Sequence, residues 1–108
     1  MLVPLALAAC AGGSGASPSS VATDHVDLPK SYRFAPPVVT VRAGTSVSWT
    51  NDDNFTHSVE FDGDTAPGQV MKPGESTTRA FPTAGTFHYI CAFHPQNMKG
   101  TVVVTAPG

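Results

Sequence analysis

Apolar and polar residues alternate along much of the chain with a period of two, which is typical of half-buried β-strands. Residues that favour turns, chiefly Gly, Pro, Asn and Asp, separate the alternating segments. The sequence shows no apolar stripe with the 3.6-residue period of an amphipathic helix. We expect about seven or eight short strands. The clearest candidates are residues 31–34, 38–42, 46–50, 57–61, 75–81, 85–91 and 100–105.

Short strands with one apolar face predict an all-β fold in which two packed antiparallel sheets bury those faces. The segment 75–81 conflicts with the alternation, because Arg79 shares a face with Phe81 and its guanidinium must reach the edge of a sheet. Residues 62–74 hold three Gly, two Pro and two Asp, so they are expected to form mostly loop. We expect one folded domain over residues 25–106.

The chain begins with an apolar segment, residues 1–9, that ends at Cys10. The sequence Leu-Ala-Ala-Cys at this point resembles the cleavage box of bacterial lipoproteins, in which the Cys becomes the lipidated N-terminus. The segment is too short to span a bilayer, and we expect it to be the remnant of a signal peptide. The basic stretch that usually precedes such a segment is missing, and an ordinary N-terminus with an unmodified Cys is the alternative.

Residues 10–24 would then comprise the lipidated Cys10 and a Gly/Ser-rich linker, a composition that behaves as a flexible coil. This organisation predicts an exported domain, tethered to a membrane through lipid chains in the periplasm or at the cell surface. A disulfide between Cys10 and Cys91 is the alternative use of the two cysteines.

Composition narrows the classes of function. Only 13% of the 108 residues are charged, and the net charge is −2. A nucleic-acid-binding domain needs a basic face, so we expect no nucleic-acid partner. The length suffices for one small domain, which we expect to be a monomer.

Four side chains offer the donors of a metal site. Cys91, His94 and Met98 lie within eight residues near the C-terminus, so one loop can wrap them round a single ion. His57 begins an alternating segment, in phase with its core-facing residues. One thiolate, two imidazoles and a weak thioether are the ligands of a mononuclear blue copper centre. A zinc site is chemically possible for the Cys and the two His, but an axial Met gives zinc nothing that it needs.

The other two histidines do not fit this site. His88 is out of phase with Cys91 on the same predicted strand, and His25 lies at the boundary of the linker. Phe93 and Pro95 flank His94; they form an apolar docking patch if Phe93 is exposed, and not if it is buried.

Acidic residues cluster in one part of the sequence. They either steer a basic partner or are ordinary turn and surface residues. The cluster consists of Asp52, Asp53, Glu60, Asp62 and Asp64.

The run from Val47 to Val104 resembles a cupredoxin, most closely the amicyanin, plastocyanin and pseudoazurin group. The matching pieces are Val-Ser-Trp-Thr-Asn, His-Ser-Val-Glu-Phe, Ala-Gly-Thr-Phe-His-Tyr-Ile-Cys and Met-Lys-Gly-Thr-Val-Val-Val. The resemblance implies a Greek-key β-sandwich with one type 1 copper that cycles between Cu(I) and Cu(II). The copper ligands that it implies are His57, Cys91, His94 and Met98.

The resemblance also implies that the backbone N–H of Ser58 reaches the Cys91 sulfur. Asn51 either ties the two ligand loops together or is only a turn residue. Three residues separate His94 from Met98, one more than in amicyanin and one fewer than in plastocyanin, so Gln96 is a minor alternative axial donor.

We expect a one-electron carrier whose donor and acceptor proteins dock near His94. Plastocyanin contacts partners through an exposed aromatic where this chain has Ile90, so docking on that side is not expected. A copper-binding or delivery protein is the alternative. An enzyme is not expected, because copper oxidases and nitrite reductases place further His ligands beside the Cys, whereas Ile90 and Ala92 flank Cys91.

Overall fold

The computed structural model describes residues 20–64 and 68–107. These residues form eight strands and no helix. No helix in the described part of the chain could therefore cross a membrane. The strands are β1 (His25–Leu28), β2 (Val38–Arg42), β3 (Thr45–Asn51), β4 (His57–Phe61), β5 (Gln69–Met71), β6 (Ser76–Phe81), β7 (Gly85–Ile90) and β8 (Lys99–Thr105).

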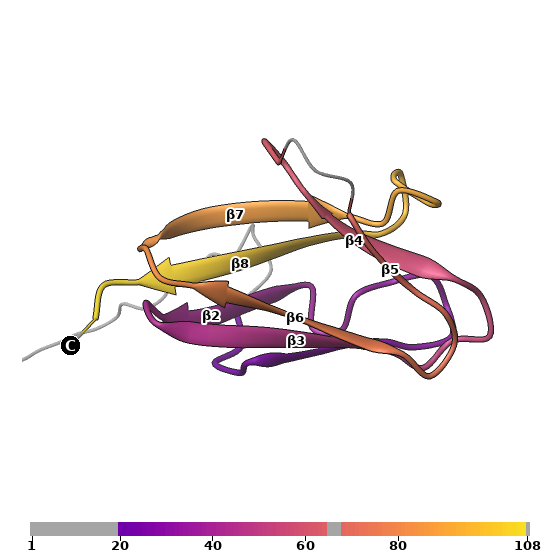
Figure 1. The fold of residues 1–108 in the computed structure, drawn as a ribbon, viewed down its shortest axis with the longest axis horizontal. Coiled ribbons are helices and arrows are strands. Elements are labelled where there is room, and N and C mark those ends of the chain that lie inside the picture. The colour runs from indigo at the N-terminus through magenta and orange to yellow at the C-terminus, as the bar shows by residue number, and fades with distance from the viewer. Residues whose placement is uncertain (1–19, 65–67, 108) are drawn as a thin grey trace, which may run out of the picture.

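The strands form two sheets packed face to face, in the orders β1-β3-β6 and β2-β8-β7-β4-β5 (Figure 1). The predicted all-β Greek-key sandwich is confirmed, but the expectation of purely antiparallel sheets is wrong. β1 pairs with β3, and β2 with β8, in parallel. Strands β1 to β4 alternate between the two sheets, so β1 lies beside β3, which runs in the same direction, and not beside its neighbour in sequence.

One predicted strand is wrong, and one predicted loop segment contains a short strand that was not expected. Residues 31–34 belong to a turn and a loop, and the first strand is β1. Tyr32 in that turn has a φ of +54°, a left-handed conformation that breaks the extended run. The segment 62–74, expected to be mostly loop, contains β5. This edge strand has only three residues, too few for a detectable alternation.

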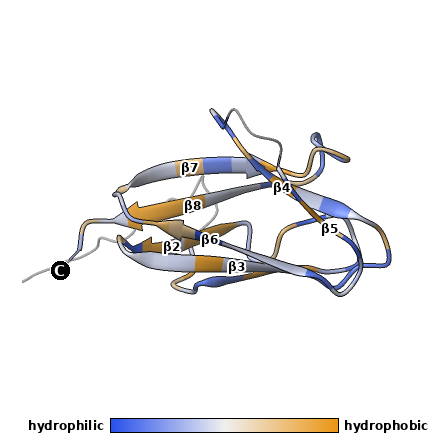
Figure 2. Cartoon of the chain, viewed as in Figure 1, coloured by the Kyte–Doolittle hydropathy of each residue, from blue (hydrophilic) through white to orange (hydrophobic). Residues whose placement is uncertain are grey.

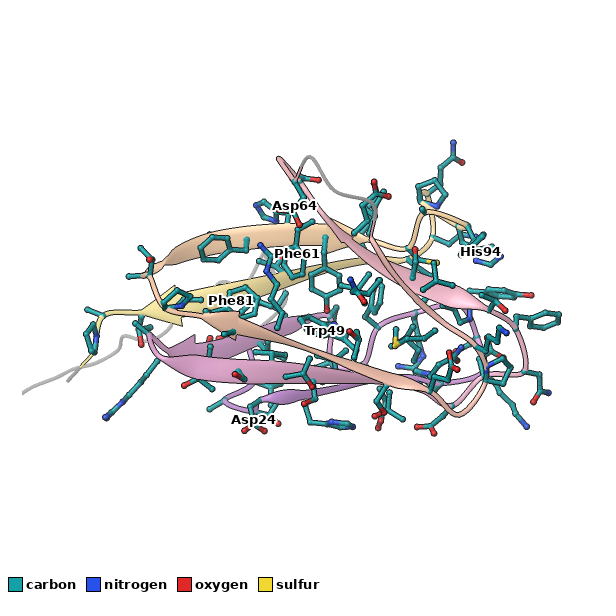
Figure 3. All side chains as sticks on the ribbon, viewed as in Figure 1. Asp24, Trp49, Phe61, Asp64, Phe81 and His94 are labelled. Carbon is teal, nitrogen blue, oxygen red and sulfur yellow. The ribbon has the colours of Figure 1, made fainter. Side chains whose placement is uncertain are left out.

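The alternation of the remaining strands places one face of each in the core. Figure 2 shows hydrophobic segments within β2, β3, β7 and β8 beside more polar ones. Trp49 is fully buried, and its ring lies 5.8 Å from that of Phe61 and 5.4 Å from that of Tyr89. Both contacts are edge-to-face, the favoured geometry for aromatic pairs. Trp49 and Phe61 therefore join the two sheets at the centre of the molecule (Figure 3).

Arg79 shares a face with Phe81, and the edge position of β6 lets its guanidinium reach solvent. Arg79 lies on β6, at the edge of the three-stranded sheet, and its guanidinium is 4.4 Å from the centre of the Phe61 ring. The same guanidinium donates to Asp64 Oδ2 at 2.7 Å, and this bond holds the pKa of Asp64 below its usual value. The side chain thus covers an aromatic ring while its charge stays at the surface.

The segment expected as linker begins to contact the sandwich before residue 25. The backbone N–H of Val21 donates to Val38 O at 3.0 Å, and Thr40 N–H donates to Val21 O at 2.9 Å. Residue 21 therefore covers part of the free edge of β2.

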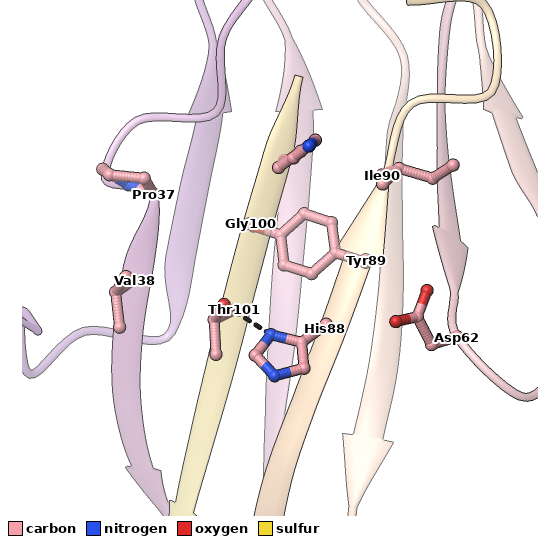
Figure 4. Close-up of a pocket in the computed structure, with 9 residues that line it drawn as sticks. Pro37, Val38, Asp62, His88, Tyr89, Ile90, Gly100 and Thr101 are labelled. Carbon is pink, nitrogen blue, oxygen red and sulfur yellow. Dashed lines mark hydrogen bonds between the residues drawn. The ribbon is translucent and has the colours of Figure 1, made fainter. Parts of the chain in front are cut away.

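We predict that Gly100→Ala destabilises the domain. Gly100 lies opposite Tyr89 in the pairing of β7 with β8, and a Cβ there would overlap the Tyr89 ring (Figure 4). Overpacking of this kind costs about 1–3 kcal/mol, and urea denaturation should show a lowered midpoint. Thr86→Ala, at an exposed position of β7, serves as the control.

The cost of Gly100→Ala should shrink when the ring is removed by Tyr89→Leu, because the two side chains then no longer overlap. An unchanged midpoint for Gly100→Ala in the wild-type background would contradict the close packing of this pair.

Candidate metal centre

Three of the predicted donors meet at one end of the sandwich. His57 is the first residue of β4, Cys91 follows β7, and His94 lies in the loop after it. Their donor atoms all lie within 4.8 Å of one another. The Cys91 sulfur is 3.6 Å from His57 Nδ1 and 3.9 Å from His94 Nδ1. His57 and Cys91 are buried, whereas His94 is half-buried and points outward at this end (Figure 3).

The loop from Cys91 to Met98 is closed by its own backbone. The N–H of His94 donates to Cys91 O at 3.1 Å, that of Met98 to His94 O at 2.9 Å, and that of Cys91 to Met98 O at 3.1 Å. Met98 is fully buried, while Gln96 is exposed. Met98 is thus the loop residue that joins Cys91 in the core, and Gln96 remains at the surface.

The Cys91 sulfur accepts hydrogen bonds from the neighbouring strand. The Ser58 backbone N–H donates to it at 3.3 Å, and the Ser58 hydroxyl lies 4.0 Å away. That hydroxyl in turn accepts a bond from Ala92 N–H at 2.8 Å. The bond from the Ser58 N–H fixes the position of the sulfur.

Asp53 was not predicted as a site residue, yet its carboxylate lies directly behind His57. The Nε2–H of His57 donates to Asp53 Oδ2 at 2.8 Å, and both side chains are buried. The bond from His57 is the main reason that the pKa of Asp53 lies below its usual value, so the carboxylate is charged at neutral pH. Because Nε2 carries the proton, the Nδ1 of His57 is left free as a donor atom.

Asn51 holds the loop that leads to His57. Its side-chain amide donates to Phe55 O at 2.8 Å and to Met71 O at 3.0 Å, and its Oδ1 accepts from Asp53 N–H at 2.9 Å. The sequence left open whether Asn51 ties the two ligand loops together or is only a turn residue. These bonds tie its own loop to β5, and none of them reaches the Cys91 loop.

Two aromatic residues that the sequence did not single out, Tyr32 and Phe55, lie at this end of the sandwich, and Tyr32 contacts both imidazoles. The Tyr32 ring lies 4.6 Å from that of His94 and 5.8 Å from that of His57, measured between ring centres. Phe55 stacks on Tyr32 at 5.7 Å and is half-exposed. Both come from loops, where a periodic pattern gives no sign of which residues will meet.

The remaining polar candidates lie away from the centre. His88 is on the outer face of the five-stranded sheet, where its Nδ1 is 3.0 Å from Thr101 Oγ1 (Figure 4). His25 is exposed and lies 3.0 Å from Asp27. Asp53 does not belong to the surface charge of the acidic cluster, because its side chain is buried beside His57.

The donor set is chemically suited to copper. A thiolate suits Cu(I), imidazole nitrogens suit Cu(II), and a trigonal arrangement of one Cys and two His with a distant Met is typical of blue copper sites. Both imidazoles present Nδ1 toward the sulfur.

Comparisons with known proteins agree with this chemistry. A model of the copper-binding proteins of the plastocyanin/azurin family matches residues 22–105. Plastocyanin of Tetradesmus obliquus is 41% identical over 83 residues, which are 66% of this chain and 57% of that protein. Amicyanin-alpha of Methylorubrum extorquens is 35% identical over 77 residues, 67% of this chain and 64% of that protein. This chain thus spans about three fifths of each of these two relatives.

Solved structures show the same architecture. The reduced state of an amicyanin mutant superposes with a TM-score of 0.69 and 31% identity, covering 82% of this chain and 94% of that one. The fold, the converging donors and these similarities lead to one conclusion: the chain belongs to the plastocyanin/azurin family of copper-binding proteins, and His57, Cys91, His94 and Met98 make up a site typical of type 1 copper.

Proposed function

We propose that this chain carries single electrons between redox proteins, with copper held by His57, Cys91, His94 and Met98. The observation that carries the proposal is the meeting of His57 Nδ1, Cys91 Sγ and His94 Nδ1 within 4.8 Å at one end of a closed sandwich. Copper, when bound, supplies the one-electron Cu(I)/Cu(II) couple. The protein supplies a fixed set of donors for both oxidation states.

Hydrogen bonds within the protein hold the donors in place. His57 is oriented by Asp53, and Cys91 by the Ser58 N–H. His94 is placed by the short bonds that close its loop. A scaffold that holds the ligands rigidly limits the rearrangement that accompanies a change of charge, and this favours fast electron exchange.

The route for the electron leads through His94. Its imidazole is half-buried at the end of the molecule, and the neighbouring Phe93 is 53% exposed. The sequence left open whether Phe93 is exposed or buried, and its exposure supports docking at this surface. Phe55 stacks on Tyr32 and is 55% exposed, so exposed apolar side chains lie near the imidazole. We define Phe55, Phe93 and Pro95 as the docking patch for donor and acceptor.

Carriage is favoured over delivery because two donors, His57 and Cys91, are fully buried. A delivery protein must release its ion to a partner, which needs ligands that the partner can reach. Here only His94 is accessible, and an electron can leave through it while the ion stays.

We further propose that the protein is exported and lipid-anchored through Cys10, as a monomer in the periplasm or at the cell surface. Residues 1–9, Cys10 and most of the linker lie outside the described residues, so this part of the proposal depends on the sequence pattern alone. The linker would meet the sandwich at Val21 on the edge of β2.

Loading the protein with copper tests the proposal. We expect an intense visible absorption from thiolate-to-copper charge transfer in the oxidised form, which disappears on reduction and survives a competing chelator. Cys91→Ser should lose this band, because a serine oxygen cannot give the thiolate-to-copper charge transfer. Rapid loss of copper to the chelator would favour a delivery protein, and a band that persists in Cys91→Ser would contradict the ligand assignment.

We predict that Phe93→Glu slows electron exchange between oxidised and reduced copies of this protein. A carboxylate in the docking patch must be desolvated on contact and repels its counterpart, so the rate at low salt should fall at least about tenfold. NMR line broadening of mixed oxidation states measures this rate. Val21→Glu makes the same change at an exposed apolar residue on the β2 edge and should leave the rate nearly unchanged.

A further inference from the structure

Three ion pairs occur among the described residues, and His57 with Asp53 is the one pair in which both side chains are buried. The two side chains are 0% and 4% exposed, and their atoms are 2.8 Å apart. The other two ion pairs of the described residues, His25 with Asp27 and Arg79 with Asp64, have side chains that are one third to one half exposed. A charge held in such surroundings is little screened and acts strongly on its neighbours.

We propose that Asp53 is a positioning residue that fixes the tautomer of His57 and lowers the reduction potential of the centre by favouring Cu(II). This inference rests on the proposed copper site and adds to it a residue that sets its potential.

Hydrogen bonds hold both oxygens of the carboxylate and the backbone of Asp53. Its Oδ2 accepts from His57 Nε2, and its Oδ1 accepts from the Asn54 backbone N–H at 2.6 Å. Its own backbone N–H donates to Asn51 Oδ1 at 2.9 Å, and Asn51 is anchored to Met71 O at 3.0 Å. Asp53 therefore cannot swing away from the imidazole without breaking this network.

Two effects follow from this geometry. A His that donates its second ring N–H to a carboxylate is held in one orientation and becomes a stronger base at the other nitrogen. The negative charge also stabilises Cu(II) more than Cu(I), because the oxidised ion carries one more positive charge. Both effects favour the oxidised form, so removal of the charge should raise the potential.

A purely structural role for Asp53 is the competing explanation, since the residue also stabilises the turn before β4. The chain offers a matched control in Asp52, which is exposed and adjacent in the same loop. Asp52→Asn makes the same change of charge without touching His57. A general loss of negative charge near the site would affect both variants, whereas the proposed role belongs to Asp53 alone.

The test compares Asp53→Asn with Asp52→Asn by measuring the reduction potential and the affinities for Cu(I) and Cu(II). Loss of a partner that orients a ligand lowers metal affinity by about 10–100-fold. We expect Asp53→Asn to weaken Cu(II) at least tenfold more than Cu(I), which for a one-electron couple is a rise in potential of about 59 mV. Asp52→Asn should change neither quantity appreciably, and Asp53→Glu should restore part of the effect.

The copper-free protein gives an independent readout. Nitrogen NMR shifts of the His57 ring should report the Nε2–H tautomer in the wild type and lose this preference in Asp53→Ala. A wild-type ring protonated at Nδ1 instead would overturn the inference, whatever the variants do.

Failure of the inference and failure of the proposed function are separable. A wild type with a reversible copper couple whose potential is the same in Asp53→Asn would overturn the role of Asp53 and leave the carrier function standing. Equal shifts in Asp53→Asn and Asp52→Asn would overturn it as well. A wild type that shows no copper couple at all would overturn both.

Discussion

The antiparallel pairing of β4 with β7 is the constraint on which the metal centre depends. Phe61 pairs with Tyr89 and Glu60 with Ile90, so the first residue of β4 lies at the end of β7. This register sets the Cys91 sulfur within 3.3 Å of the Ser58 N–H and 3.6 Å from His57 Nδ1. Because side chains alternate between the faces of a sheet, a slip of one residue would turn the imidazole away from the sulfur. The aromatic cluster around Trp49 fixes the register, since Phe61 and Tyr89 both pack on that ring.

A group of buried polar residues also supports the metal centre. Asn51, Asp53 and Ser58 are all buried, and each bonds to the backbone or to a donor side chain. Buried polar groups are costly unless they are paired, so this group of residues is stable in one arrangement only. Its hydrogen bonds therefore hold His57 and Cys91 in fixed positions at the ends of their strands.

Strand phase and ligand spacing could be predicted from the sequence, because both depend on local patterns. The phase of His57 in its strand and of Cys91 in its own follows from alternation, and the spacing of Cys91, His94 and Met98 is explicit in the chain. Contacts between loops could not be predicted from the sequence. Asp53 looked like one more acidic turn residue, and nothing in the pattern placed Tyr32 over His94. The parallel pairing of β1 with β3 depends on crossings between sheets, which propensity does not encode.

The rings of Tyr32 and Phe55 have one more consequence. Tyr32 packs against the two imidazoles, Phe55 stacks on Tyr32, and the Met98 side chain is fully buried. His57, Cys91 and Met98 are fully buried, so a small molecule has little access to them, whereas the His94 imidazole is partly accessible at the surface. With copper in the proposed site, this arrangement would favour outer-sphere electron exchange at the surface over chemistry on a bound substrate.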